Sequence, residues 1–232
     1  MAATGTKSNT AGACWHCHAA SSGGHFCSDC GKIQPLAPGT GFFAFFGLSQ
    51  KLQLDAAALD DLFLKLSWKL HPDNFATAGA EERSLSLERA SQLNDAYRTL
   101  RDPVSRVEYL LLRAGVRKEG QTKQQTPPEL LEEVFELNEW LEELRTARQG
   151  TADGELSELR HRLRTAQRSF ESRLGDVDAQ LQDAFAAWDA ALDAQAGEPQ
   201  RAALMARMNE ILNRRSYIRN LVASVGNELA EG

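Results

Sequence analysis

The residues with the clearest chemical meaning are four cysteines near the start of the chain, Cys14, Cys17, Cys27 and Cys30. They form two CxxC pairs with nine residues between them. Each pair places two thiolates on one tight turn, and two facing turns make a tetrahedral sulfur site typical of structural zinc. Iron in the same cage remains an alternative, because thiolates bind both metals. We therefore predict a structural metal site in residues 1–40.

Other roles for these cysteines have less support. Disulfides are rare in a reducing compartment, and a redox CxxC normally lies in a βαβ pattern, which the sequence lacks. His16, His18 and His25 could each replace a thiolate, although a solvated loop histidine is the simpler interpretation. A closed four-thiolate site has no open coordination position, which argues against catalysis by the metal.

The second candidate site is the tripeptide His71-Pro72-Asp73. Pro72 lacks an amide proton and disfavours helical backbone at His71, so a preceding helix must end there. The tripeptide would then present an imidazole and a carboxylate at the tip of a helical hairpin. A solvent-reachable Asp73 is suited to pair with an arginine of a partner. Taken alone, the tripeptide is more simply explained as a proline-terminated helix.

Apolar spacing predicts the helices that position the tripeptide. One helix is expected over 55–70 and a second over about 80–101. A third opens at Asp102-Pro103, a capping residue followed by a favoured first-turn proline, and ends at Gly115. A polar linker over 116–126 follows.

The remainder, 127–230, is predicted to form three antiparallel amphipathic helices. Thr126 and Glu129 make a capping box for the first of them. The apolar stripe from 156 to 192 keeps its phase through Gly175, which predicts one helix of about 40 residues, or roughly 60 Å. The chain turns again near 197–199, where the last helix begins.

Arg215 interrupts the apolar stripe of that last helix, and the sequence offers no reason for it. No convincing strand is present. We therefore expect an all-α fold with a small metal-binding segment at its start.

Charge and hydropathy exclude several classes of protein. The net charge of −6 argues against nucleic-acid binding, and no apolar run approaches the roughly 20 residues that span a membrane. The first 13 residues lack the apolar core of a signal peptide and contain one basic residue, Lys7, which fits a mitochondrial presequence poorly. We expect a bacterial cytoplasmic protein, with the mitochondrial matrix as the fallback. The oligomeric state is left open.

The landmarks around the tripeptide occur in the order found in J domains. The stretches 45–48, 71–73 and 93–100 (Phe-Phe-Gly-Leu, His-Pro-Asp and Leu-Asn-Asp-Ala-Tyr-Arg-Thr-Leu) carry the resemblance, and residues 41–115 thus resemble a J domain. This implies docking on the ATPase domain of a DnaK-class chaperone and stimulation of its ATP hydrolysis. The implied contact residues are His71, Pro72 and Asp73, with Lys65 and Lys69 as the basic face.

The chain departs from the J-domain pattern in the charge around the tripeptide. Asn74 replaces the usual basic residue, and Asp60, Asp61 and Trp68 dilute the basic face. Long-range electrostatic steering of the partner should therefore be weak.

A J domain followed by a three-helix bundle resembles the HscB family, from about Gly41 to Leu229. The tetracysteine segment resembles an extension found on a subset of that family. The resemblance implies a co-chaperone that binds an IscU-type iron–sulfur cluster scaffold and delivers it to a DnaK/HscA-class chaperone. The implied scaffold contact is the first bundle helix, with Tyr217 as a further aromatic contact, although an aromatic at helical spacing is more often core.

The first bundle helix also has a second face of its own. Leu131 and Phe135 lie about 100° around the helix from the core stripe, and Glu136, Glu139 and Glu143 continue that side. An apolar patch edged by carboxylates is typical of a modest interface. The alternative is that Leu131 and Phe135 widen the core stripe.

Three functions follow from these patterns. An adaptor without catalysis of its own would use the tripeptide, the patch and the metal segment. A metalloenzyme would need a nucleophile with its base, a phosphate loop or an open metal position, and the sequence has none of these. A zinc-ribbon nucleic-acid protein conflicts with the acidic charge.

Overall fold

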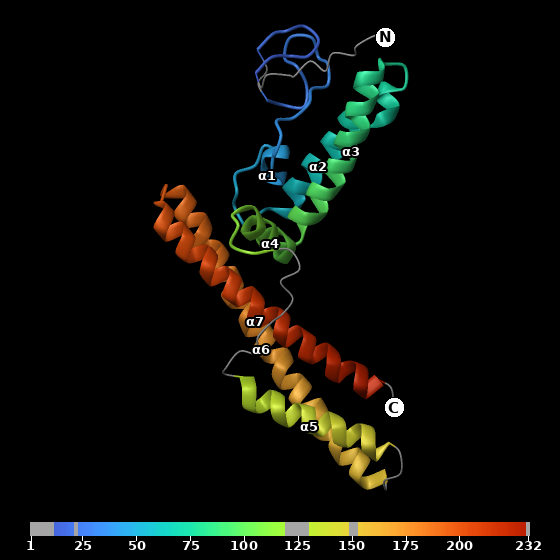
Figure 1. Cartoon of the computed structure of the whole chain (residues 1–232), viewed down its shortest axis with the longest axis vertical. Helices are drawn as coiled ribbons and strands as arrows, with labels where there is room; N and C mark the ends of the chain where they lie inside the picture. The colour runs from blue at the N-terminus through green and yellow to red at the C-terminus, as the bar shows by residue number, and fades with distance from the viewer. Residues whose placement is uncertain (1–11, 21–22, 119–129, 149–152, 231–232) are drawn as a thin grey trace, which may run out of the picture. The chain divides into compact units, whose positions relative to one another are not determined.

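The computed structural model describes residues 12–20, 23–118, 130–148 and 153–230. Within these ranges the regular secondary structure is helical, the segment before α1 is made of turns, and the only β pairing is two isolated bridges, Ala13–Ala20 and Phe26–Ile33 (Figure 1). The predicted all-α fold is therefore confirmed. None of the helices in these ranges is both long and apolar enough to span a membrane. The helices are α1 (Phe42–Phe45), α2 (Ala56–Leu70), the 3-10 helix η1 (Pro72–Phe75), α3 (Ala80–Arg101), α4 (Pro103–Arg113), α5 (Leu131–Ala147), α6 (Asp153–Asp193) and α7 (Glu198–Ala230).

The chain divides into two compact units, Met1–Arg106 and Val107–Gly232. The division falls inside α4, whereas the sequence placed the domain boundary in the linker 116–126. The four-part organisation proposed from the sequence remains a prediction. Most of that linker, and the capping box at Thr126 and Glu129, lie outside the described residues.

Helix α2 begins and ends where its local chemistry requires. The Asp55 carboxylate accepts from the amides of Ala57 (2.9 Å) and Ala58 (3.3 Å), which caps the first turn. At the other end His71 takes an extended conformation (ψ 131°), as a residue before proline should, and Pro72 opens η1. The tripeptide thus lies between the end of one helix and a single turn of 3-10 helix.

Helices α2 and α3 pack as a hairpin around an apolar core. The ring of Phe63 stacks on that of Tyr97 with centroids 4.1 Å apart, and the Ser86 hydroxyl donates to the Leu70 carbonyl at 2.8 Å. The second bond satisfies a carbonyl at the end of α2 that has no helical partner. The buried apolar residues of this unit include Phe43, Phe45, Phe46, Leu52, Leu59, Leu70, Phe75, Leu85, Leu93, Ala96 and Leu100.

Helix α4 starts at the predicted cap and ends before the predicted glycine. The Asp102 carboxylate accepts from the Ser105 amide at 2.7 Å. Gly115 has a left-handed φ of 72°, and its amide donates to Leu112 while the Val116 amide donates to Leu111. Such a pair of bonds closes a helix on a glycine.

In the second unit, α6 is the common partner of α5 and α7. It runs without a break through Gly175, as the phase of its stripe predicted. Arg173 pairs with Glu133 of α5 at 2.6 Å. The unexplained Arg215 of α7 reaches Asp178 of α6 at 2.5 Å. A charged residue in the apolar stripe is therefore accounted for by a carboxylate on the facing helix. The buried residues that line these contacts include Leu137, Leu141, Leu144, Leu163, Phe170, Val177, Leu181, Phe185, Trp188, Met208, Ile211, Leu212, Ile218 and Val225.

Candidate functional site

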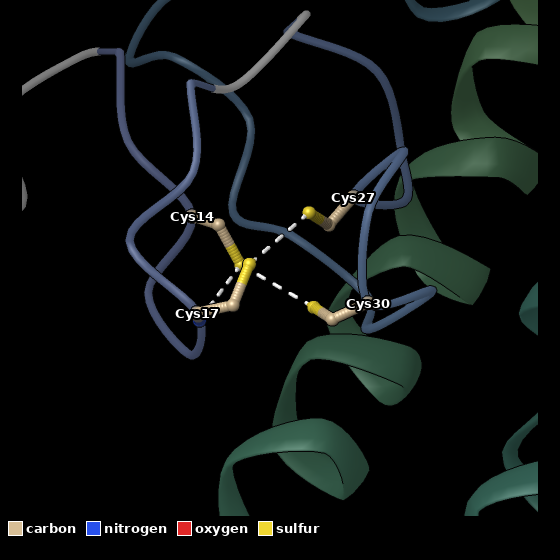
Figure 2. Close-up of side chains that lie close together, drawn as sticks. All are labelled: Cys14, Cys17, Cys27 and Cys30. Carbon is tan, nitrogen blue, oxygen red and sulfur yellow. Dashed lines mark hydrogen bonds between the residues drawn. The ribbon is translucent and has the colours of Figure 1, made fainter.

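The four cysteine side chains converge on one point from two turns (Figure 2). All four sulfur atoms lie within 4.8 Å of one another, with Cys14 3.6 Å from Cys30 and Cys17 3.7 Å from Cys27. Four sulfurs bound tetrahedrally to zinc at about 2.3 Å would lie roughly 3.8 Å apart. The Cys14–Cys30 and Cys17–Cys27 separations match this value, and the donor set could therefore hold a four-coordinate metal ion. Among the described residues no other cluster of three or more metal-binding side chains occurs.

The two turns have the same backbone design. In each, the first cysteine amide donates to the carbonyl five residues later, at 2.8 Å for Cys14 and 2.9 Å for Cys27. The residue before that carbonyl has left-handed backbone, Gly31 with φ 71° in the second turn and His18 with φ 61° in the first. His18 thus shapes the turn, and its exposed side chain lies outside the sulfur cluster.

The sulfur atoms influence one another's protonation. Burial raises the pKa of Cys14, but the amides of Cys17 and His16, which donate to its sulfur at 3.4 Å each, lower it to about 6. A backbone hydrogen bond at Ala19 lowers the pKa of Cys17, yet burial and the neighbouring cysteines outweigh it and raise that pKa to about 12. Four thiolates at this spacing repel one another, and a divalent cation would remove that repulsion.

The metal-binding turns are attached to α1 by His25. Its Nε2 lies 2.9 Å from the Phe45 carbonyl, and its ring packs edge-on against the Phe45 ring with centroids 4.6 Å apart. Burial lowers the pKa of His25, which favours the neutral imidazole that donates to this carbonyl. His25 is therefore a structural contact of this segment and lies outside the sulfur cluster.

The attachment to α3 is polar and largely buried. Lys32 pairs with Glu82 at 2.7 Å, and the Glu82 side chain is only 8% exposed. Arg89, with 2% of its surface exposed, donates to the Gln34 carbonyl at 3.5 Å and also to Gln92. Sequence reasoning missed these contacts, because a glutamate and an arginine in a charged helix give no sign that a distant loop will cover them.

The tripeptide is presented to solvent. The side chains of His71 and Asp73 are 54% and 88% exposed, and Pro72 is half-buried. The Asp73 amide donates to Nδ1 of His71 at 3.3 Å, which fixes the ring over the turn. The side-chain amide of Asn74 donates to the backbone carbonyl of Trp68 at 2.5 Å, which caps the last turn of α2. The contact roles implied by the resemblance remain predictions.

The basic face of α2 is less diluted than the sequence suggested. Lys65 and Lys69 are exposed, as a contact role requires. Asp60, however, accepts from the Tyr97 hydroxyl at 2.7 Å and from Arg101 at 3.1 Å. The Tyr97 hydrogen bond, aided by Arg101, lowers the pKa of Asp60. Its charge is thus neutralised within the hairpin, and only Asp61 remains as an exposed carboxylate on α2.

On α5, the second face expected from the sequence is open to solvent. Leu131 and Phe135 are 54% and 66% exposed. The alternative, that they widen the core stripe, does not describe this structure. The carboxylates expected beside them, Glu136, Glu139 and Glu143, are also exposed.

Two grooves between α5 and α6 are lined by the carboxylates expected beside this face. Glu136 lines one of about 390 Å³ together with Trp140 and Phe170. Glu139 and Glu143 line a second of about 690 Å³. Trp140 was missed by sequence reasoning, because its position lies on the side opposite Leu131 and outside the leucine stripe.

Tyr217 lies on α7 and is half-buried. The pairs Glu133–Arg173 and Asp178–Arg215 place the start of α5 and the middle of α7 at a similar level of α6. Leu131 and Tyr217 therefore lie at similar positions along the length of α6. Their joint role in scaffold binding remains a prediction.

Comparison with known proteins identifies the family. No protein-family model matches the chain. It is 36% identical over 151 residues to the co-chaperone protein HscB homolog of Vibrio vulnificus strain YJ016, an alignment that covers 65% of this chain and 84% of that protein. It is 42% identical over 102 residues to the homolog of Vibrio parahaemolyticus, with 44% of this chain and 60% of that protein aligned.

Solved structures agree with this assignment. The fold matches the crystal structure of human co-chaperone protein HscB with a TM-score of 0.57 over 93% of this chain and 98% of that one, at 23% identity. It matches the chaperone HscB from Vibrio cholerae with a TM-score of 0.52 over 81% and 96%, at 29% identity. The chain therefore belongs to the HscB family of J-domain co-chaperones of iron–sulfur cluster assembly, with a four-cysteine cluster near its N-terminus.

Proposed function

We propose that this protein binds an IscU-type iron–sulfur scaffold and delivers it to a DnaK/HscA-class chaperone, whose ATP hydrolysis it stimulates. It has no catalytic activity of its own, and it acts in the bacterial cytoplasm. The observation that carries the proposal is the exposed His71-Pro72-Asp73 turn at the end of α2. A carboxylate that is 88% exposed and held by a proline turn is available for a bidentate ion pair with a partner's arginine.

The test of the chaperone contact is steady-state ATP hydrolysis by the cognate chaperone in the presence of scaffold. Wild-type protein should accelerate hydrolysis, and Asp73→Ala should remove the acceleration. Asp61→Ala, which removes an exposed carboxylate one helical turn before Lys65 on α2, is the matched control and should leave the acceleration intact. Equal stimulation by wild type and Asp73→Ala would reject the assignment.

We assign the scaffold contact to Leu131 and Phe135, with Glu136, Glu139 and Glu143 at the rim and Tyr217 as a further aromatic contact. Two large apolar side chains, one turn apart and exposed by more than half, have the anatomy of an interface centre. The double variant Leu131→Ala/Phe135→Ala should lose capture of purified scaffold. Leu87→Ala removes a leucine of similar exposure from α3, and this control variant should still capture the scaffold.

The metal in the cysteine cluster is proposed to be zinc with a structural role. The four cysteines would hold it in a closed site, which leaves no position for substrate. Mass spectrometry of the native protein should find one metal ion per chain, and a cobalt-substituted sample should give the absorption of a tetrahedral thiolate site. A spectrum indicating bound water or a fifth ligand would contradict the closed site.

A further inference from the structure

The outer face of α2 carries an apolar ridge that the proposed function does not use. Trp68 is 79% exposed and Leu64 is 57% exposed. Four residues apart on one helix, they lie one above the other on the same side. The large apolar side chains this exposed in the described part of the chain are Leu64, Trp68, Leu87, Leu131 and Phe135. Two of them form the proposed scaffold patch on α5, and two form this ridge on α2.

The ridge is continuous with the tripeptide. Trp68 lies three residues before His71, and its carbonyl accepts the hydrogen bond from Asn74, the residue after Asp73. This 2.5 Å hydrogen bond fixes the backbone at Trp68 to the residue that follows the tripeptide, so the base of the Trp68 side chain and the tripeptide are held at the same end of α2. A partner that contacts Asp73 closely would meet Trp68 in the same approach.

The surroundings of the ridge indicate the chemistry of that partner. Lys65 and Lys69 are exposed and neighbour the ridge along the same helix, so the complementary surface is apolar with an acidic edge. With Asn74 in place of a basic residue, few charges remain to attract the partner from a distance. Tryptophan with a charged rim is the side chain most often found to dominate binding at such interfaces.

We propose that Leu64 and Trp68 are apolar anchors that dock on the ATPase domain of the DnaK-class chaperone, and that burial of this ridge carries most of the affinity of the encounter. This inference rests on the proposed function. It assigns separate roles to neighbouring residues. Asp73 triggers hydrolysis, whereas Trp68 and Leu64 determine the concentration at which the trigger is reached.

The experiment uses the full-length, metal-loaded protein and purified cognate chaperone with ATP. Stimulated hydrolysis is measured against co-chaperone concentration, and binding is measured separately by calorimetry. Trp68→Ala should raise the half-maximal concentration by about tenfold or more while the maximal rate is retained, since truncation of an anchor tryptophan typically costs that much affinity. Leu64→Ala should raise it less, and Trp68→Phe should restore most of the loss. Leu87→Ala, an equally exposed leucine on α3, is the control and should change nothing.

The salt dependence of the half-maximal concentration distinguishes apolar burial of the ridge from attraction by the lysines. Between about 50 mM and about 200 mM salt, the half-maximal concentration for wild type should change by less than roughly threefold, because apolar burial is not screened. Lys65→Ala/Lys69→Ala should have a smaller effect than Trp68→Ala at the higher salt. Circular dichroism and thermal unfolding should match wild type for each variant, since the replaced side chains are exposed.

The outcomes that overturn the inference are distinct from those that overturn the proposed function. If Trp68→Ala binds and stimulates like wild type, or if Leu87→Ala is equally impaired, the ridge is not the anchor. If Trp68→Ala changes only self-association in sedimentation, the ridge covers a second copy of this chain and the inference is wrong. If wild type binds the chaperone through Trp68 but Asp73→Ala stimulates normally, the ridge stands and the assigned trigger falls.

Discussion

Two regions, the cysteine segment (residues 12–34) and the bundle of α5, α6 and α7, are stabilised in opposite ways. The described residues of the cysteine segment, 12–20 and 23–34, contain little buried apolar surface apart from Ile33, Cys14 and Cys27, and are joined to α1 and α3 by hydrogen bonds and one ion pair. The bundle buries a long stripe of leucine, phenylalanine and valine along α6 and places its ion pairs at the edges. A short segment cannot bury enough surface to fold alone, so a metal must supply the missing free energy. The bundle needs no such ligand.

The largest expected effect is loss of the metal. Chelation, or the variant Cys14→Ser/Cys27→Ser, should unfold residues 12–34, because binding energies of about 10–16 kcal/mol drive the folding of such segments. Hydrogen exchange measured by mass spectrometry should show loss of protection there and little change in α6 and α7. His16→Ala is the matched control, since His16 lies between two ligands but outside the sulfur cluster. Metal release from that control would contradict the ligand set.

The next effect is confined to the bundle. Phe185, 1% exposed on α6, should cost about 3–5 kcal/mol of unfolding free energy when replaced by alanine, because a cavity remains. Chemical denaturation followed by circular dichroism measures this loss. Metal content, measured in parallel as the control, should stay at one ion per chain. Loss of metal from Phe185→Ala would mean that the two regions are stabilised together.

A smaller effect is expected where the cysteine segment meets α3. Glu82→Gln should cost about 1–2 kcal/mol, since the bond from Lys32 loses one of its charges in a largely buried place. Glu81→Gln, an exposed neighbour in the same turn, controls for the helix dipole. In metal-free protein the difference between the two variants should vanish, because Lys32 is then no longer held near α3. A difference that persists in metal-free protein would mean that the Lys32–Glu82 pair forms without the metal.

Within the bundle, Glu228 provides a pH-dependent contact. The hydrogen bond from Arg145, with further attraction from Arg148, lowers the pKa of Glu228 below its ordinary value of 4.5. The resulting stability is fully present above that value and is lost as pH falls through the lower folded-state pKa. Glu228→Gln should therefore lower Tm by a few degrees at neutral pH and by progressively less in acid. Glu142→Gln, at an exposed site beside the same arginine, should have little effect at any pH.

The smallest predicted change is a gain. Gly175 is exposed in the middle of α6, and a Cβ atom placed there would meet no other atom within 4 Å. Gly175→Ala should stabilise the bundle by about 0.5–1 kcal/mol, because alanine restricts the unfolded chain and suits a helix. Gly115→Ala is the contrasting variant and should destabilise, since Gly115 has a left-handed φ of 72°. A loss of stability in Gly175→Ala would indicate that this glycine has an unrecognised role.

The two regions also differ in how far they could be predicted from sequence. Repeating stripes predicted the bundle helices, including the continuity of α6 through Gly175, because period and burial are local properties of a helix. The spacing of Cys14, Cys17, Cys27 and Cys30 predicted their convergence, because a metal-binding turn is local too. The contacts of Lys32 with Glu82 and of Arg215 with Asp178 could not be predicted. They depend on which distant helix lies opposite, and pattern alone does not contain that register.

One consequence follows from the uninterrupted α6. Helix α5 and helix α7 are each registered on α6 through an ion pair, and on each other through Arg145, Arg148 and Glu228, so the three helices together fix the angle between the surfaces that α5 and α7 carry. A single residue inserted near Gly175 would advance the later half of α6 by about 1.5 Å and turn it by roughly 100° relative to the earlier half, so that α7 could not keep its contacts with Gln167 and Asp178 at the same time. Two full turns, about seven residues, would nearly restore the angle while lengthening the rod. Evolution can therefore change the spacing of these surfaces in steps of helical turns, and not one residue at a time.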